Sequence, residues 1–142
     1  MSYDLMVFNP NKAPKDKSDF MNWYESQTEW EEDHDYDDPE VSSEELKNWF
    51  LEMIEAFPAM NGPFASTNVD DPKVTDYTVG MDVIYAAFAW SEAENAYLKM
   101  TELAEKNNVG FFDASGSGDI FFPNESGKLK KTSDEKPWWK FW

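Results

Sequence analysis

Cysteine is absent from this chain of 142 residues, and its absence excludes several kinds of chemistry. Without thiols the chain has no disulfides, no thiolate nucleophile and no zinc or iron–sulfur site with cysteine ligands. A domain without disulfides suits a reducing compartment. The N-terminus shows no signal-peptide pattern, and no apolar run approaches the roughly 20 residues that span a bilayer. We therefore expect a cytoplasmic protein.

Arginine is absent as well: all 12 basic residues are lysines, against 29 acidic residues, and the net charge is −17. Nucleic-acid binding needs a basic surface and usually arginine, so we expect none. Anionic lipid would repel such a chain, so we expect no membrane binding either. The charge favours a basic protein as partner, because opposite charges steer association. The alternative is that the acidity only keeps the protein soluble.

Histidine occurs once, as His34, and this limits the catalytic chemistry open to the chain. The carboxylates around His34 favour its protonated form, which makes it a poor general base. No serine stands in a nucleophile-elbow pattern. We expect a non-enzymatic protein without catalytic residues. The alternative is a small enzyme that uses two of its many carboxylates.

Acidic residues are concentrated in one block. Residues 18–45 hold twelve of them and no lysine, whereas residues 124–142 are mildly basic. Aromatic side chains, which often anchor interfaces, stand beside these acids. We therefore predict that partner binding involves the following residues of the block: Trp30, Glu31, Glu32, His34, Tyr36 and Asp38.

The same block contains a spacing typical of calcium loops. Asp33, Asp35 and Asp37 stand at positions 1, 3 and 5 of an EF-hand-like loop, and Glu44 stands at position 12. Such a loop supplies the oxygen ligands that Ca²⁺ requires, but its position 6 is Asp38, where a sharp turn needs glycine. A calcium site at these four acids is one hypothesis. The other hypothesis is a solvated acidic loop in a protein without a cofactor.

Hydrophobic periodicity predicts the elements of secondary structure. Strands are expected at residues 3–8, 77–80, 83–89, 109–112 and 120–122, and helices at residues 18–30, 42–57 and 91–106. The order β-α-α-β-β-α-β-β predicts an α+β fold. More specifically, it predicts a two-layer sandwich, ferredoxin-like or related, with the helices on one face of one sheet.

Serine residues are expected to cap these helices. Ser18 is placed to begin the first helix. The pairs Ser42 with Glu45 and Ser91 with Glu94 have the spacing of a capping box at the start of the second and third helices.

Composition changes near the end of the chain. Residues 1–123 are expected to form a single α+β domain, and residues 124–142 are expected to be a polar, lysine-containing linker with an aromatic tail. The tail ends in Trp138, Trp139, Phe141 and Trp142. We expect it to fold back over an apolar patch of the domain. Docking into a partner or contact with a membrane surface are the alternatives.

Three stretches carry a resemblance to known proteins: Met-Ser-Tyr-Asp-Leu at residues 1–5, Ala-Trp-Ser-Glu-Ala-Glu at residues 89–94 and Val-Gly-Phe-Phe-Asp at residues 109–113. In these the chain resembles a broad set of small bacterial α+β proteins, over about residues 1–122. The resemblance implies a shared fold and no catalytic residue. Small acidic proteins of this kind often serve as immunity or antitoxin partners in bacterial toxin systems, so an immunity-type protein is our more specific expectation.

Overall fold

The structure, a computed structural model, describes residues 2–30, 32, 36–67 and 70–131. Along the chain it contains β1 (Tyr3–Phe8), α1 (Lys17–Gln27), the 3-10 helix η1 (Pro39–Val41), α2 (Glu44–Ala56), β2 (Asp76–Val79), β3 (Val83–Phe88), the 3-10 helix η2 (Trp90–Glu92), α3 (Ala93–Asn107), β4 (Gly110–Phe112), β5 (Ile120–Pro123) and β6 (Leu129–Lys131). The predicted order of strands and α-helices is present, with one further strand at the end. The α+β class is therefore confirmed.

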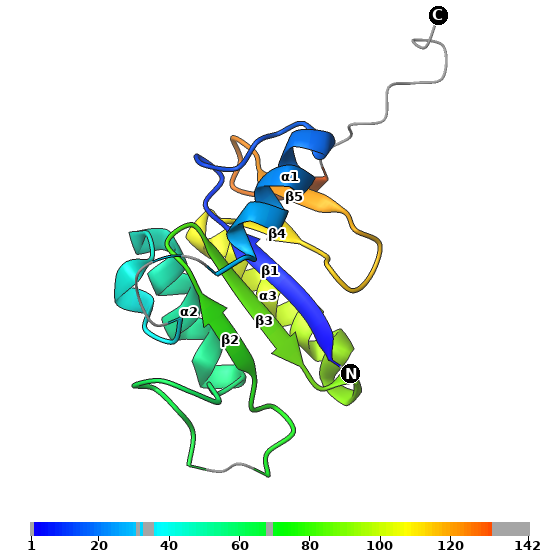
Figure 1. Ribbon diagram of the computed structural model, residues 1–142. Coiled ribbons are helices and arrows are strands. Elements are labelled where there is room, and N and C mark those ends of the chain that lie inside the picture. Colours follow the sequence, from blue (N-terminus) through cyan, green and yellow to red (C-terminus); the bar gives the residue numbers. More distant parts are fainter. Residues whose placement is uncertain (1, 31, 33–35, 68–69, 132–142) are drawn as a thin grey trace, which may run out of the picture.

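The six strands of the described chain form one sheet in the order β2-β3-β1-β4-β5-β6, and all neighbouring strands are antiparallel (Figure 1). β1 pairs with β3 from Tyr3 opposite Phe88 to Phe8 opposite Val83, and with β4 on its other side. Five of its six residues are buried, as expected of an apolar run in the interior of a sheet. The narrower ferredoxin-like designation stays a prediction.

Side chains alternate along β1 and divide the core into two parts. Leu5 and Val7 point to the face covered by α2 and α3, whereas Met6 and Phe8 point to the face that carries α1. This alternation is the period of a strand. Because both faces are apolar at the centre of the sheet, both need a cover. The expectation that all helices lie on one face is therefore wrong for α1.

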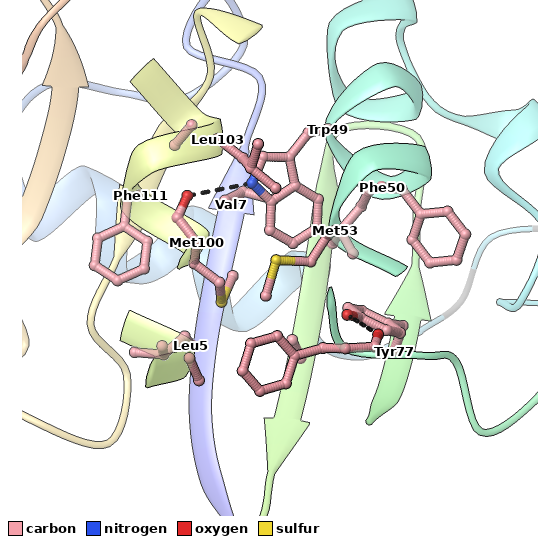
Figure 2. Packing of buried hydrophobic residues seen from close by; sticks show 14 of the residues in the cluster. Leu5, Val7, Trp49, Phe50, Met53, Tyr77, Met100, Leu103 and Phe111 are labelled. Atoms are coloured by element: carbon pink, nitrogen blue, oxygen red, sulfur yellow. Dashed lines mark hydrogen bonds between the residues drawn. The ribbon is translucent and has the colours of Figure 1, made fainter. Parts of the chain in front are cut away.

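The larger part of the core lies between the sheet and the pair α2 and α3 (Figure 2). α2 buries Leu46, Trp49, Phe50 and Met53, which recur at helical spacing. The indole N–H of Trp49 donates to the carbonyl oxygen of Met100 in α3 at 3.3 Å. The polar N–H of Trp49, the largest buried side chain, therefore has a hydrogen-bond partner. These two helices and the sheet make the predicted two-layer sandwich.

α1 covers only part of the opposite face. Phe20 of α1 is fully buried and packs on Phe8 and Phe112, with ring-centroid distances of 5.0 and 5.3 Å. These contacts hold α1 over β4 and β5, where Figure 1 shows it in blue. Among the described residues, no helix covers this face over β2, where Asp76 is exposed, and Tyr85 of β3 is only half-buried. The candidate site described below lies on this uncovered part of the sheet.

α1 is shorter than the periodicity predicts. Its cap is Asp16 and not Ser18, because the Asp16 carboxylate accepts the N–H of Asp19 at 3.1 Å. The helix ends at Gln27, so Trp30 lies beyond it. Trp30 has a left-handed backbone with φ of 54°, which a right-handed helix cannot contain.

The other two helices also begin differently from the prediction. Ser43, and not Ser42, caps α2 by accepting the N–H of Leu46 at 3.4 Å. Ser42 instead donates its hydroxyl to the carbonyl oxygen of Gly80 at 2.6 Å and so ties this loop to the turn between β2 and β3. α3 follows the 3-10 turn η2 without a side-chain cap, so the capping box predicted at Ser91 is wrong.

β6 falls in the segment for which the sequence predicts a linker. It pairs with β5, with Pro123 opposite Leu129, and Leu129 packs against the main core. Its two lysines suit an edge strand, since charge discourages pairing with another sheet. Residues 129–131 are thus a strand and not a linker, while residues 132–142 lie outside the described residues. Within the described part, every helix is too short or too polar to cross a membrane.

Candidate functional site

A cleft of about 340 Å³ opens on the uncovered part of the sheet, beside the C-terminal end of α1. Side chains from β1, β2 and β3 line it together with the end of α1 and the residues that follow. The lining residues are Ser2, Asp4, Tyr24, Thr28, Trp30, Asp76, Thr78, Tyr85 and Ala87. Carboxylates, hydroxyls and aromatic rings thus converge on one concave surface, where a ligand can contact several of them at once.

Four hydrogen bonds hold Asp4 in the cleft. The hydroxyl of Tyr85 donates to Asp4 Oδ2 at 2.6 Å, and the hydroxyl of Ser2 donates to Oδ1 at 2.6 Å. The backbone N–H of Asp4 donates to Ser115 Oγ at 2.7 Å, and the Ser115 N–H donates to the Asp4 carbonyl oxygen at 2.9 Å. The carboxylate therefore has a fixed orientation before any ligand arrives, which reduces the entropy lost on binding.

Ser115 belongs to the loop between β4 and β5, and Asp113 organises this loop. Asp113 is only 8% exposed, and its carboxylate accepts the N–H groups of Gly116 at 2.9 Å and Ser117 at 3.3 Å. A Cβ at Gly116 would lie 2.5 Å from the Asp113 carboxylate, so a side chain at this position would displace the carboxylate. The loop thus places Ser115 against β1 and fixes the start of the strand that carries Asp4.

Two tyrosines line the cleft as neutral phenols. Burial raises the pKa of Tyr85, and the hydrogen bond to the Asp4 carboxylate raises it further. Burial also raises the pKa of Tyr24, although a side-chain hydrogen bond with Tyr85 acts in the opposite direction. Both groups are therefore hydrogen-bond donors at neutral pH and not bases. The negative charge of the cleft resides on its carboxylates.

Trp30 brings an indole ring to the cleft at a cost in backbone energy. Its left-handed φ of 54° is unfavourable for a bulky residue by roughly 1–2 kcal/mol. Contacts with two other rings offset this cost: the ring centroids of Tyr36 and Tyr85 lie 5.3 and 6.3 Å from that of Trp30. Strain of this kind is common where a side chain has to be aimed at a ligand.

A second hollow, of about 420 Å³, adjoins the cleft along β2, and Asp76 and Thr78 line both. Asp37 and Gly62 lie on its other side, where two loops approach closely. Gly62 has φ of +86°, and a Cβ there would lie 2.4 Å from the carbonyl oxygen of Asp37. The cleft and the hollow together form one acidic surface with the carboxylates of Asp4, Asp37 and Asp76.

Lysines of the described chain leave this acidic surface free. None of the ion pairs between described residues involves Asp4, Asp37 or Asp76. These ion pairs are Lys47 with Glu40, Lys73 with Glu92, Lys99 with Glu102, Lys106 with Glu52, Lys128 with Glu105 and Lys131 with Asp119. The charge of the three aspartates is therefore not neutralised by lysines of the part of the chain that the structure describes.

Two of the residues predicted to bind a partner lie at this surface. Trp30 lines the cleft, and Tyr36 lines the adjoining hollow and contacts the Trp30 ring. Glu31 and His34 lie outside the described residues.

Structural contacts occupy the other two predicted partner residues. Glu32 accepts the N–H of Met81 at 3.1 Å and so connects the acidic block to the turn between β2 and β3. Asp38 caps η1 by accepting the N–H of Glu40 at 3.0 Å. The Asp38 side chain therefore has a local role that the sequence analysis did not assign to it.

The predicted calcium ligands fall mostly beyond what the structure describes. Asp33 and Asp35 lie outside the described residues, Asp37 lines the hollow, and Glu44 is the first residue of α2. Within residues 2–30, 32, 36–67 and 70–131, no group of three His, Cys, Asp or Glu side chains is arranged to hold a metal ion. The calcium site stays a prediction.

Sequence analysis missed most of the cleft. Asp4, Asp76 and Tyr85 come from three strands that are distant in the chain, and only the sheet brings them together. One signal was present: an aspartate in the otherwise apolar strand Tyr3–Phe8. The cleft holds two carboxylates, Asp4 and Asp76, so the carboxylate-based enzyme also stays a prediction.

Comparisons with protein families, with curated proteins and with solved structures found no match for this chain. The resemblance to small bacterial α+β proteins therefore stays a prediction, and the chemistry of the cleft is the basis for a function.

Proposed function

We propose that the protein is a non-enzymatic module that binds a basic partner protein through the cleft and the adjoining hollow. The position of Asp4 and Asp76 in one cleft with Tyr24, Trp30 and Tyr85 carries this proposal. Carboxylates attract a cationic side chain, and the faces of aromatic rings stabilise it further. A basic residue of the partner inserts here, and its neighbours contact the surrounding acidic surface.

The charge of the whole chain supports the same partner. A net charge of −17 attracts a basic protein over several ångströms and increases the association rate. This long-range part is screened by salt, whereas contacts inside the cleft are screened less. An immunity or antitoxin protein for a basic toxin is the more specific form of the proposal, and it is supported by the small size and acidity of the chain.

A titration of the ¹⁵N-labelled protein with a short lysine- and arginine-containing peptide tests the proposal. We expect the largest chemical-shift changes at Asp4, Thr78 and Tyr85, because these residues line the cleft. The double variant Asp4→Asn, Asp76→Asn should weaken binding about a hundredfold or more, since each of the two lost charge-assisted contacts contributes roughly 1.5–3 kcal/mol. Raising the salt concentration should weaken binding of the unaltered protein.

Two controls separate the cleft from the general charge of the protein. Glu94 is exposed on α3, away from the cleft, so Glu94→Gln removes a charge without touching the site. It should leave the affinity within about twofold, as expected of a distant, screened surface charge. A peptide with glutamine in place of each basic residue should not bind. Shift changes spread evenly over the acidic surface, with both variants equally affected, would contradict the proposal.

A further inference from the structure

We propose that the cleft selects arginine over lysine, so that the basic partner inserts an arginine side chain between Asp4, Asp76 and the aromatic rings. This inference rests on the proposed function and names the side chain that the partner contributes.

The first basis of the inference is the fixed carboxylate of Asp4. The hydroxyls of Ser2 and Tyr85 each donate to a different oxygen at 2.6 Å, and this sets the plane of the carboxylate. Each oxygen keeps a further lone pair for a ligand. A fixed planar carboxylate suits the parallel N–H groups of a guanidinium better than the point charge of an ammonium.

The number and spread of acceptors form the second basis. A guanidinium has five N–H donors in one plane, whereas an ammonium has three. The cleft offers the Asp4 carboxylate on β1, the Asp76 carboxylate on β2, and the hydroxyls of Thr28 and Thr78. These acceptors belong to separate elements around the cleft. A wide planar donor can reach several of them together, while a compact ammonium reaches fewer.

Aromatic rings form the third basis. Trp30 and Tyr85 line the cleft with their ring centroids 6.3 Å apart, and Tyr24 lines it from α1. A guanidinium stacks on aromatic faces and is more weakly hydrated than an ammonium, so it loses less on leaving water. The left-handed backbone of Trp30 keeps this indole at the cleft. The volume of about 340 Å³ is near the lower end of ligand pockets and matches one inserted side chain.

The chain itself contains lysine but no arginine. No residue of this chain can therefore offer the preferred group to its own cleft or to the cleft of a second copy of the chain. Arginine selectivity would in this way separate a true partner from the lysines of the protein's own surface, which are present at high local concentration.

Three peptides test the inference. They share the same sequence with lysines at fixed flanking positions, and they differ at one central residue, which is arginine, lysine or citrulline. Citrulline has nearly the shape of arginine without its charge. Because the flanking lysines are constant, the general electrostatic attraction is similar for the arginine and lysine peptides.

Binding to the full chain is measured by calorimetry and by chemical-shift changes at Asp4, Tyr85 and the Trp30 indole. We expect the arginine peptide to bind at least tenfold more tightly than the lysine peptide, and the citrulline peptide to bind most weakly.

Variants connect the selectivity to the cleft. Asp4→Asn should bring the arginine and lysine peptides within about twofold of each other, because the planar pair is lost. Glu94→Gln should leave the ratio unchanged, since this residue lies on α3 away from the cleft. Circular dichroism confirms that each variant is folded. Equal affinity of the arginine and lysine peptides, with shift changes still centred on the cleft, would overturn the selectivity and leave the binding module intact. Absence of shift changes at the cleft with any peptide would overturn both proposals.

Discussion

Gly62 is the residue at which two loops meet beside the hollow, and it allows no other side chain. Its φ is +86°, and an added Cβ would lie 2.4 Å from the carbonyl oxygen of Asp37. Gly62→Ala should lower the free energy of unfolding by about 2–3 kcal/mol, from backbone strain and from the displaced loop. It should also weaken binding of a basic peptide, because Asp37 lines the hollow. Denaturant unfolding and the peptide titration measure the two effects.

Gly127, in the turn between β5 and β6, provides the matched control for this substitution. It has φ of +77°, but an added Cβ there would meet nothing within 4 Å. Gly127→Ala should therefore show the backbone strain alone, about 1–2 kcal/mol, without the effect on binding. If the two variants lose equal stability and both bind the peptide normally, the close contact between Gly62 and Asp37 is not important.

Single residues also show which parts of the candidate site the sequence indicated. Trp30 and Tyr36 were predicted to bind a partner because large rings stand among acids in the sequence. Both line the candidate surface, and their role in binding stays a prediction. Asp4 was not predicted. Its partners Tyr85 and Ser115 are 81 and 111 residues away in the chain, so no local pattern indicates these contacts.

Among the elements, the loop between β4 and β5 supports the cleft without lining it. Asp113→Asn removes the charge from a carboxylate that accepts the N–H groups of Gly116 and Ser117. We expect a loss of about 1–3 kcal/mol in the free energy of unfolding, because the buried Asp113 side chain loses the charge that strengthens its two hydrogen bonds. Asp4 should lose part of its fixed orientation, since Ser115 would no longer be held against it.

The control for this loop is Asp119→Asn, which removes the same charge from the same loop. Asp119 is half-buried, and its carboxylate lies 3.9 Å from the Lys131 amine, a weak surface contact. This variant should lose less than about 1 kcal/mol. Hydrogen exchange at the N–H groups of Gly116 and Ser117 distinguishes the two: faster exchange is expected for Asp113→Asn alone. Equal exchange in both variants would show that Asp113 does not organise the loop.

Elements with strong periodicity were predictable, and their ends were not. α2 was recognised from its apolar stripe, because Leu46, Trp49, Phe50 and Met53 recur at helical spacing and are all buried. The end of α1 was missed, because a backbone turn at Trp30 leaves no mark in the hydrophobic pattern. β6 was missed because lysines on an edge strand look like a polar linker in the sequence.

At the scale of the molecule, the fold class and the order of the elements were predictable from the hydrophobic pattern of the sequence. The face of the sheet that α1 covers was not. Phe20 and Phe8 are apolar in the sequence, but which face of the sheet they share depends on the register of β1. The uncovered part of that face, and the cleft on it, follow from the position of α1. The site could therefore not be predicted before the topology was known.

Tyrosine ionisation should limit the stability of the whole domain at alkaline pH. Burial raises the pKa of Tyr77, Tyr85, Tyr24 and Tyr97, and burial together with the nearby Asp113 charge raises the pKa of Tyr3 to about 12. In the unfolded chain these phenols ionise near pH 10. The folded state holds the protons more tightly, so this stability is fully present below about pH 10 and is lost as the pH rises through about 12. Phenolate absorbance and circular dichroism should therefore change together in an alkaline titration.

Tyr77→Phe should make the free energy of unfolding fall less steeply above pH 10, because one buried phenol no longer titrates. High salt in both titrations screens the general repulsion among the acidic residues. Ionisation of most tyrosines near pH 10 with the fold intact would show that these phenols are open to solvent. The hydrogen bond from Tyr85 that fixes Asp4 in the cleft would then be open to solvent as well.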